Sequence, residues 1–177
     1  MQSIFDHIFN TLIKNNINLI LIGGFSLSFY KVTRRTTDID FLINKDDINK
    51  AKNLLAKNDF ELIYENNLAL QFRNNKITFL NIDFIIVDNK TFESMFSEGK
   101  KVTIKNYEFT IPNLNHLIAL KLHAIKSDSK RKYKDLTDIF DLIQHNSKDL
   151  INTDIISLCE TYADSDTKST IFNELKL

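Results

Sequence analysis

Cysteine, proline and glycine are scarce in this chain of 177 residues, which contains one Cys, one Pro and three Gly. The single cysteine, Cys159, cannot form an internal disulfide, and this is typical of proteins that work in a reducing cytosol. So few glycines and prolines exclude collagen-like chains and Pro/Gly-rich linkers. The sequence therefore predicts a folded protein of the cytoplasm.

Long apolar runs and an excess of charge of one sign are also missing. No stretch reaches the ~18 apolar residues that a membrane-spanning helix needs, so no membrane span is predicted. The first residues show no basic segment before an apolar one, so no signal peptide is expected. The 23 Lys and Arg balance the 23 Asp and Glu. A formal net charge of zero argues against a protein that coats polyanions along its whole surface.

Hydrophobic residues make up 43% of the chain, which is enough to form a buried core. At this length we expect one domain, or a compact core with a small appendage. The periodicity predicts a half that mixes helices and strands, followed after Pro112 by a helical segment, which together make an α+β chain. We place the boundary between a core, residues 1–111, and a helical segment packed on it, residues 112–177.

Apolar periodicity predicts the individual elements. Helices are expected at residues 3–15, 25–31, 46–57, 91–97, 113–126, 133–145, 153–163 and 166–175. Strands are expected at residues 18–23, 38–43, 60–64, 68–73, 76–87, 101–104 and 107–111, with a turn at Asn74 and Asn75 and a hairpin around Asn106.

A glycine pair lies between the first predicted strand and the following helix, in residues 21–26 (Leu-Ile-Gly-Gly-Phe-Ser). Glycines at such a position let backbone N–H groups approach a phosphate, and a helix N-terminus favours an anion. Ser26 would supply a hydroxyl donor to the same phosphate, beside the backbone N–H groups at Gly23 and Gly24. The alternative is a tight turn without a ligand. The segment is neither a Rossmann fingerprint nor a Walker A loop.

Two carboxylates share one face of the next predicted strand. Asp38 and Asp40 are two residues apart, so they point the same way and lie about 7 Å apart along the strand. They repel each other unless a cation lies between them, and Mg²⁺ prefers such oxygen ligands together with phosphate oxygens. The alternative is an exposed polar strand face, which the apolar Ile39 and Phe41 disfavour.

A third carboxylate, Asp83, lies inside an apolar strand (residues 81–87). An isolated buried carboxylate is costly unless it is paired or binds a metal. If this strand lies beside that of Asp38 and Asp40, the three carboxylates converge. The alternative is a salt bridge from Asp83 to Lys76 or Arg73.

This order of motifs resembles the nucleotidyltransferase superfamily with the polymerase-beta-like fold. Gly-Gly-x-Ser is followed after 11 residues by Asp-x-Asp, and later by an acid between apolar residues. The resemblance covers about residues 17–87, and implies an α+β fold whose core is a small mixed β-sheet packed on helices. It also implies that the glycine motif and the first two acids hold the triphosphate and a metal. The third acid then completes the metal site and helps to deprotonate the attacking hydroxyl. The resemblance thus implies that Asp38, Asp40 and Asp83 are metal ligands.

The helical segment resembles the AbiEii-type toxin branch of this superfamily, at residues 117–124 and 131–138. The resemblance makes Lys121 and Asp135 active-site candidates, with Lys121 also facing the nucleotide, and makes Asp138 a weaker one. Lys121 lies within an apolar helical stripe, where a lysine snorkels, pairs or binds an anion. Asp135 lies in a first helical turn, where an acid also favours the helix dipole.

Further cations lie near these motifs. Arg34 and Arg35 precede Asp38 closely enough to reach a phosphate, although a solvated loop is the alternative. Residues 126–134 are strongly basic. Such a segment is usually a solvated loop, and beside an active site it could hold a triphosphate or an RNA backbone.

The resemblance therefore implies an enzyme with Mg²⁺, or Mn²⁺ in its place, and an NTP as co-substrate. It would move an NMP to an acceptor hydroxyl of tRNA or protein, as the toxin of a pair with an antitoxin partner. One alternative is transfer to a small-molecule antibiotic. Another is a non-catalytic binding module with the same fold.

Overall fold

The computed structural model describes residues 3–74 and 80–177 and divides the chain into two compact units. Unit 1 comprises Met1–Ser26 and Arg34–Pro112, and unit 2 comprises Leu27–Thr33 and Asn113–Leu177. The boundary near Pro112 lies where the sequence pattern changes to helices. The structure also groups Leu27–Thr33 with the helices of unit 2, whereas the sequence-based boundary leaves this segment in the core.

Unit 1 contains a mixed β-sheet, in which seven strands are formed by the described residues in the order β3-β4-β5-β2-β1-β7-β6. The strands are β1 (Leu19–Leu21), β2 (Asp38–Asn44), β3 (Phe60–Glu65), β4 (Ala69–Asn74), β5 (Asn81–Val87), β6 (Lys100–Ile104) and β7 (Tyr107–Ile111). Strand β2 pairs with β5 in parallel and with β1 in antiparallel orientation. Strand β1 is parallel to β7, and the other neighbours are antiparallel.

Alternation along β2 and β5 separates an apolar face from a polar one. Ile39, Phe41 and Phe84 are fully buried, whereas the acids between them on the two strands lie on the opposite face. The rings of Phe41 and Phe84 stack with their centroids 6.1 Å apart, and Phe84 meets Phe72 edge to face at 5.9 Å. This aromatic layer fixes which residues of both strands are turned away from the core.

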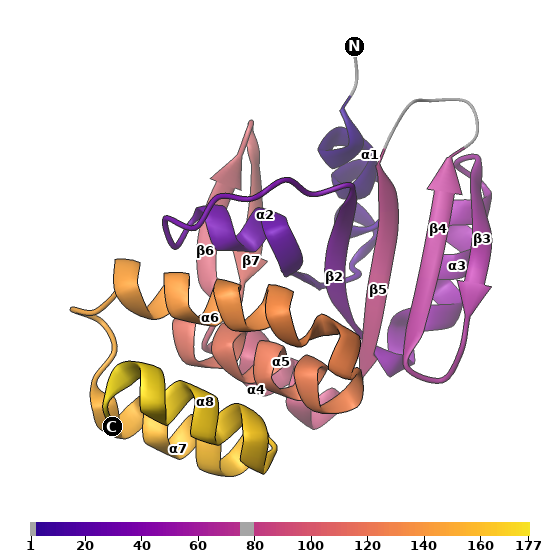
Figure 1. Ribbon diagram of the computed structural model, residues 1–177. Coiled ribbons are helices and arrows are strands. Elements are labelled where there is room, and N and C mark those ends of the chain that lie inside the picture. Colours follow the sequence, from indigo (N-terminus) through magenta and orange to yellow (C-terminus); the bar gives the residue numbers. More distant parts are fainter. Residues whose placement is uncertain (1–2, 75–79) are drawn as a thin grey trace. The chain divides into compact units, whose positions relative to one another are not determined.

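The helices of unit 1 connect and cover these strands. They are α1 (Ile4–Thr11), the first part of α2 (Gly23–Ser28), α3 (Ile48–Ala56) and α4 (Asn89–Ser97). Ser3 and Asp6 form a capping box at α1, and Asp88 accepts from Thr91 N at the start of α4. Figure 1 shows α3 behind β3 and β4, and α3 contacts β3.

Unit 2 is helical. Its helices are α5 (Leu114–Ser127), α6 (Lys132–His145), α7 (Asn152–Tyr162) and α8 (Ser165–Leu175), with a short 3₁₀ turn η3 (Ser129–Arg131) before α6. Helix α5 packs against both α6 and α7. The Asn146 side-chain amide donates to the carbonyl oxygens of Tyr30, at 2.9 Å, and Leu142, at 2.8 Å. This bifurcated link ties the segment Leu27–Thr33 to the end of α6.

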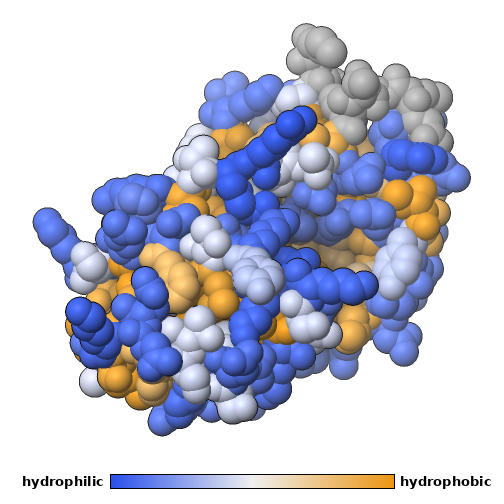
Figure 2. Space-filling model, viewed as in Figure 1, coloured by the Kyte–Doolittle hydropathy of each residue, from blue (hydrophilic) through white to orange (hydrophobic). Residues whose placement is uncertain are grey.

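The predicted fold class, an α+β fold with a mixed sheet followed by helices, is confirmed. The predicted hairpin around Asn106 is formed by β6 and β7. Of the predicted turn at Asn74 and Asn75, Asn74 is the last residue of β4. Asn75 and the first part of the strand predicted at 76–87 lie outside the described residues. Within 3–74 and 80–177 no helix is both long and apolar enough to cross a membrane. Hydrophilic side chains cover most of the face drawn in Figure 2, with hydrophobic side chains between them.

The aromatic layer predicts a large stability loss on truncation of Phe84. Phe84→Ala should lower the free energy of unfolding by about 3–5 kcal/mol, because it leaves a cavity between Phe41 and Phe72. The neighbouring Ile85 is 42% exposed, so Ile85→Ala is the control, with a loss of about 0.5 kcal/mol or less. Urea denaturation of both variants measures the difference, and equal losses would contradict the burial pattern.

Candidate active site

Three carboxylates gather on the polar face of the sheet in unit 1. In the parallel pairing of β2 with β5, Asp40 lies directly opposite Asp83, and Asp38 lies opposite Asn81. All three acids are half-buried, so each is held in the sheet and remains accessible. Arg73, one of the two alternative partners expected for Asp83, has its Nη2 atom 3.6 Å from Glu61 Oε2. The other alternative partner, Lys76, is outside the described residues.

Asp83 is positioned by Gln71 on β4. The side-chain amide nitrogen of Gln71 donates to Asp83 Oδ1 at 2.8 Å. The register places Tyr64, Gln71, Asp83 and Asp40 in one row across β3, β4, β5 and β2. Burial raises the pKa of Asp83, the hydrogen bond from Gln71 lowers it, and the negative charge of Asp38 raises it, with a net upward shift. A raised pKa means that Asp83 holds a proton more readily than a free aspartate does.

The glycine turn lies directly against the carboxylates. Gly23 has a φ of 64°, and a Cβ atom there would be 1.9 Å from Asp40 Oδ2. The Ile22 amide donates to the carbonyl oxygen of Asp40 at 2.9 Å, which ties the turn to β2. A Cβ atom on Gly24 would lie 2.8 Å from Thr36 Cβ. Both positions therefore favour glycine, since a side chain on Gly23 would clash with Asp40 and one on Gly24 would clash with Thr36.

Two hydroxyl groups complete this turn. Thr36 Oγ1 donates to the Asp38 backbone oxygen at 3.0 Å and to its Oδ1 at 3.1 Å, which holds the carboxylate in one orientation. Ser26 Oγ is buried and donates to the Gly23 carbonyl oxygen at 2.9 Å. In this structure the Ser26 hydroxyl therefore stabilises the turn itself, and its predicted contact with a phosphate stays a prediction.

Arg34 and Arg35 lie in the irregular segment before β2, in the same unit as the carboxylates. Arg34 is half-buried and Arg35 is exposed. Their position along the chain, a few residues before Asp38, keeps both guanidinium groups as candidates for phosphate binding.

A metal ion would depend on ligands beyond the protein. Among residues 3–74 and 80–177, no three His, Cys, Asp or Glu side chains lie close enough together to form a complete metal site. Mg²⁺ typically takes one or two carboxylates and completes its octahedron with water and substrate phosphates. The accessible pair Asp38 and Asp40, with Asp83 opposite, fits a metal of this kind that binds together with a nucleotide.

Lys121 and its neighbours form a buried ionic cluster in unit 2. Lys121 is 6% exposed, and its Nζ lies 2.8 Å from Asp135 Oδ1 and 2.5 Å from Asp138 Oδ2. Arg131 Nε donates to the other oxygen of Asp135 at 2.9 Å. A lysine in an apolar stripe can snorkel to solvent, form an ion pair or bind an anionic ligand, and the structure shows that Lys121 forms ion pairs. The roles of Lys121 and Asp135 in catalysis stay predictions, and the observed partners favour a role in joining α5 to α6.

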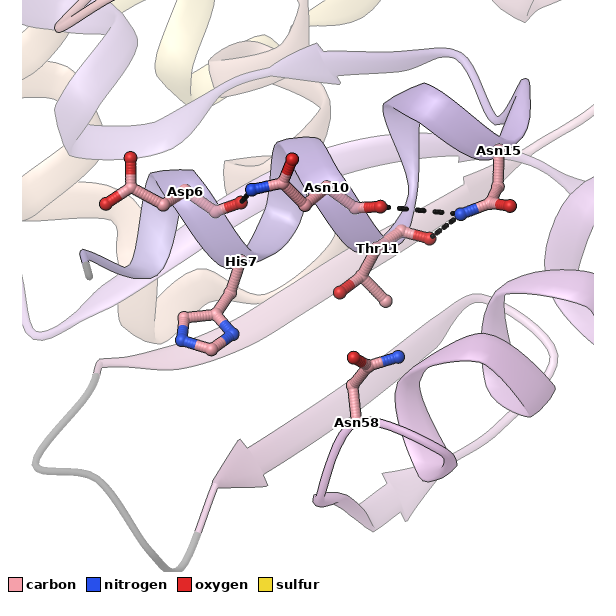
Figure 3. A pocket seen from close by; sticks show the side chains of 6 residues that line it. All are labelled: Asp6, His7, Asn10, Thr11, Asn15 and Asn58. Carbon is pink, nitrogen blue, oxygen red and sulfur yellow. Dashed lines mark hydrogen bonds between the residues drawn. The ribbon is translucent and has the colours of Figure 1, made fainter.

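A polar cavity of about 440 Å³ lies elsewhere in unit 1, beside α1 (Figure 3). Its lining residues are Asp6, His7, Asn10, Thr11, Asn15 and Asn58. Two of its amides are used within the helix, because Asn10 donates to the Asp6 carbonyl at 2.7 Å and Asn15 to the Thr11 carbonyl at 3.0 Å. None of the predicted site residues lines it, and we assign it no role.

Sequence reasoning missed two positioning residues, Gln71 and Thr36. Gln71 lies between the apolar Leu70 and Phe72, so alternation in β4 already placed it on a polar face. Nothing in the sequence indicated that this face would be beside Asp83. Thr36 carried no signal, because its contact with Asp38 depends on the local turn.

The fold is similar to those of solved nucleotidyltransferase structures. ANT(2″)-Ia in complex with adenylyl-2″-tobramycin has a TM-score of 0.67 and 11% identity, over 90% of this chain and 97% of that chain. The lincomycin-bound lincosamide antibiotic adenylyltransferase LnuA has a TM-score of 0.56 and 12% identity, over 78% and 93%. An antigenic nucleotidyltransferase-like protein from Paracoccidioides brasiliensis has a TM-score of 0.52 and 19% identity, over 76% and 71%. At these identities the common feature is the fold.

The sequence itself establishes the family. Residues 1–163 match the family described as uncharacterised nucleotidyltransferase, and the chain belongs to this family. The predicted enzyme class, a nucleotidyltransferase, is confirmed at this level. The sequences of curated proteins give no match. The narrower resemblance to the AbiEii-type branch stays a prediction.

The glycine turn predicts an energetic coupling between Gly23 and Asp40. Gly23→Ala should destabilise the protein by more than about 1 kcal/mol, because of the positive φ and the clash with the carboxylate. Asp40→Ala should relieve most of the clash, because it removes the Cγ and Oδ2 atoms and leaves only the contact with Asp40 Cβ at 2.9 Å. The double variant should therefore be more stable than the sum of the single changes by more than about 0.5 kcal/mol. Chemical denaturation of the four proteins measures the coupling, and additive losses would contradict it.

The ionic cluster predicts an acid-dependent loss of stability. Burial alone would raise the pKa of Asp135, but its ion pairs with Lys121 and Arg131 give a net lowering. A lowered pKa stabilises the folded state above the unfolded value of about 3.9, and this contribution is lost as the pH falls through the folded pKa.

Asp135→Asn should therefore lower the free energy of unfolding at pH 7 by about 1–3 kcal/mol, and should flatten the decline of stability below about pH 4. Thermal unfolding between pH 7 and pH 3 checks both effects. Asp141→Asn, on the same helix, is the matched control. An unchanged decline at low pH in Asp135→Asn would show that Asp135 is not the responsible group.

Proposed function

We propose that this nucleotidyltransferase moves an NMP from an NTP to an acceptor hydroxyl, at the site of Asp38, Asp40 and Asp83. The observation that carries the proposal is the parallel register of β2 and β5, with Asp83 opposite Asp40 and the glycine turn against Asp40. Three half-buried carboxylates on one face repel each other, and a cation with bound phosphates would offset this repulsion.

The turn at Gly23 and Gly24 would bind the triphosphate. Without side chains, the turn would let backbone N–H groups at the start of α2 come close to a phosphate. Arg34 or Arg35 would offset the remaining phosphate charge, with Lys121 as the third predicted cation. Since Lys121 already faces two carboxylates, a direct contact with phosphate would require it to exchange partners.

Asp38 and Asp40 would hold Mg²⁺, or Mn²⁺ in its place, with Asp83 as a further ligand. When bound, the metal neutralises the charge on the phosphates and the charge that develops during transfer. Asp83, oriented by Gln71, would accept the proton of the acceptor hydroxyl. The hydroxyl oxygen forms a bond to the α-phosphorus, the bond from this phosphorus to the bridging oxygen breaks, and pyrophosphate leaves with the electron pair.

The acceptor that we favour is tRNA or a protein, with a toxin role and an antitoxin partner, on the resemblance of the helical segment to the AbiEii-type branch. The second candidate acceptor is a hydroxyl of a small antibiotic. It is supported by the fold, which ANT(2″)-Ia shares in a complex with adenylyl-2″-tobramycin and LnuA shares with lincomycin bound.

Asp40→Asn tests the metal and nucleotide site. The wild type should be stabilised by an NTP only when Mg²⁺ is present, by about 2.7 kcal/mol at ligand near 100 times its dissociation constant. Asp40→Asn should keep its fold and lose both this stabilisation and all transfer from labelled NTP. Thermal unfolding with each NTP, with and without Mg²⁺, is the measurement.

Asp46→Asn is the matched control, because it removes the same charge from an exposed position just after β2. It should bind and transfer as the wild type does. Normal turnover by Asp40→Asn would refute the metal assignment. No stabilisation of the wild type by any NTP would refute the proposed activity and favour a binding module with the same fold.

A further inference from the structure

The connection between α5 and α6 in unit 2 carries five cations and one acid within residues 126–134. Two of the cations have structural roles. Arg131 pairs with the buried Asp135, and Lys132 pairs with Asp166 on α8. Both pairs hold this connection to the helices of its own unit.

The other three cations point to solvent. Lys126, Lys130 and Lys134 are exposed, and in the described part of the chain no carboxylate forms an ion pair with any of them. They lie at the end of α5, in η3 and in the first turn of α6. These elements follow one another within nine positions, so the three lysines lie along one short segment of the chain.

An exposed aromatic ring lies among these lysines. Tyr133 is 88% exposed, more than any other large hydrophobic side chain in the described residues. The next highest value is 70%, for Leu68. Exposure of a large aromatic ring to water costs free energy. In the sequence Tyr133 lies between Lys132 and Lys134. A cationic surface with an exposed ring suits a ligand with both negative charge and a planar face.

The conformation of this connection is fixed before any ligand binds. Asp128 Oδ1 accepts from the Lys130 amide at 3.0 Å, and the Asp128 carbonyl oxygen accepts from the Arg131 amide at 3.0 Å. The pair between Arg131 and Asp135 then anchors the turn to α6. The three lysines are thus displayed by a structured turn, which lowers the ordering cost of binding.

We propose that Lys126, Lys130 and Lys134 bind the sugar-phosphate backbone of single-stranded RNA, and that Tyr133 stacks on one of its bases. Lysines contact phosphates without sequence preference, and aromatic rings stack on bases that are free of a duplex. A duplex keeps its bases inside, so it would use the lysines and not the ring. That this RNA is the acceptor rests on the proposed function, whereas its binding does not.

RNA binding without nucleotide is the test, with a fluorescently labelled single strand of about 12 nucleotides and the corresponding duplex as probes. Fluorescence anisotropy over a range of salt concentrations gives the affinity and its salt dependence. Replacing the three lysines by Gln should reduce the slope of log K against log salt by about 2, at roughly 0.7 per phosphate contact. Tyr133→Ala should weaken single-strand binding at least about fivefold and leave duplex binding unchanged.

Two controls match these variants. Lys50, Lys57 and Lys90 are exposed in unit 1, and their replacement by Gln changes the net charge equally. Tyr162→Ala removes a ring that is 39% exposed on α7. Both controls should bind RNA as the wild type does. Equal effects of the lysine triple variant and its control, or no RNA binding by the wild type, would overturn the proposal, as would binding to phosphatidylserine vesicles alone.

The two proposals fail separately. Asp40→Asn should bind the RNA with wild-type affinity, because it leaves the three lysines and Tyr133 unchanged. If RNA binds and no NTP does, the proposed activity is wrong and the RNA surface remains. If an NTP binds with Mg²⁺ and the RNA does not, the RNA surface is wrong and the proposed activity remains.

Discussion

The parallel pairing of β2 with β5 is the constraint on which the candidate active site depends. The register of this pairing determines both the packing of the core and the positions of the acids, because residues opposite each other on paired strands share a face. On one face Phe41 meets Phe84 in the aromatic layer, and on the other Asp40 meets Asp83. A slip by one residue would bury the acids and expose the rings, so the burial of the phenylalanines also holds the carboxylates in place.

Two clusters of charged side chains among the described residues, one in each unit, differ in the signs of the charges that they bring together. In unit 2, Lys121 is almost fully buried with Asp135 and Asp138, and opposite charges compensate one another within the protein. In unit 1, Asp38, Asp40 and Asp83 carry the same sign and remain half-buried. In the proposed function, a cation with bound phosphates would offset the negative charge of the carboxylates in unit 1.

A net charge of zero conceals an uneven distribution of charge. It argues against a protein covered by a basic surface. The structure nevertheless divides the cations of residues 126–134 into those that pair with acids and those that face solvent. Tyr133 lies among the latter, so a local surface with its own chemistry exists on a chain that is neutral as a whole.

The sequence by itself determined the α+β class, most of the helices and strands, and which acids share a face of one strand. Periodicity is local, so it located β2 and β5 and showed that Asp38 and Asp40 share a face. Only the tertiary structure decided that β5 lies beside β2, that Gln71 donates to Asp83, and that the partners of Lys121 are acids of the next helix. These contacts join residues distant in the chain, and a pattern within one segment carries no information about which other segment will pack against it.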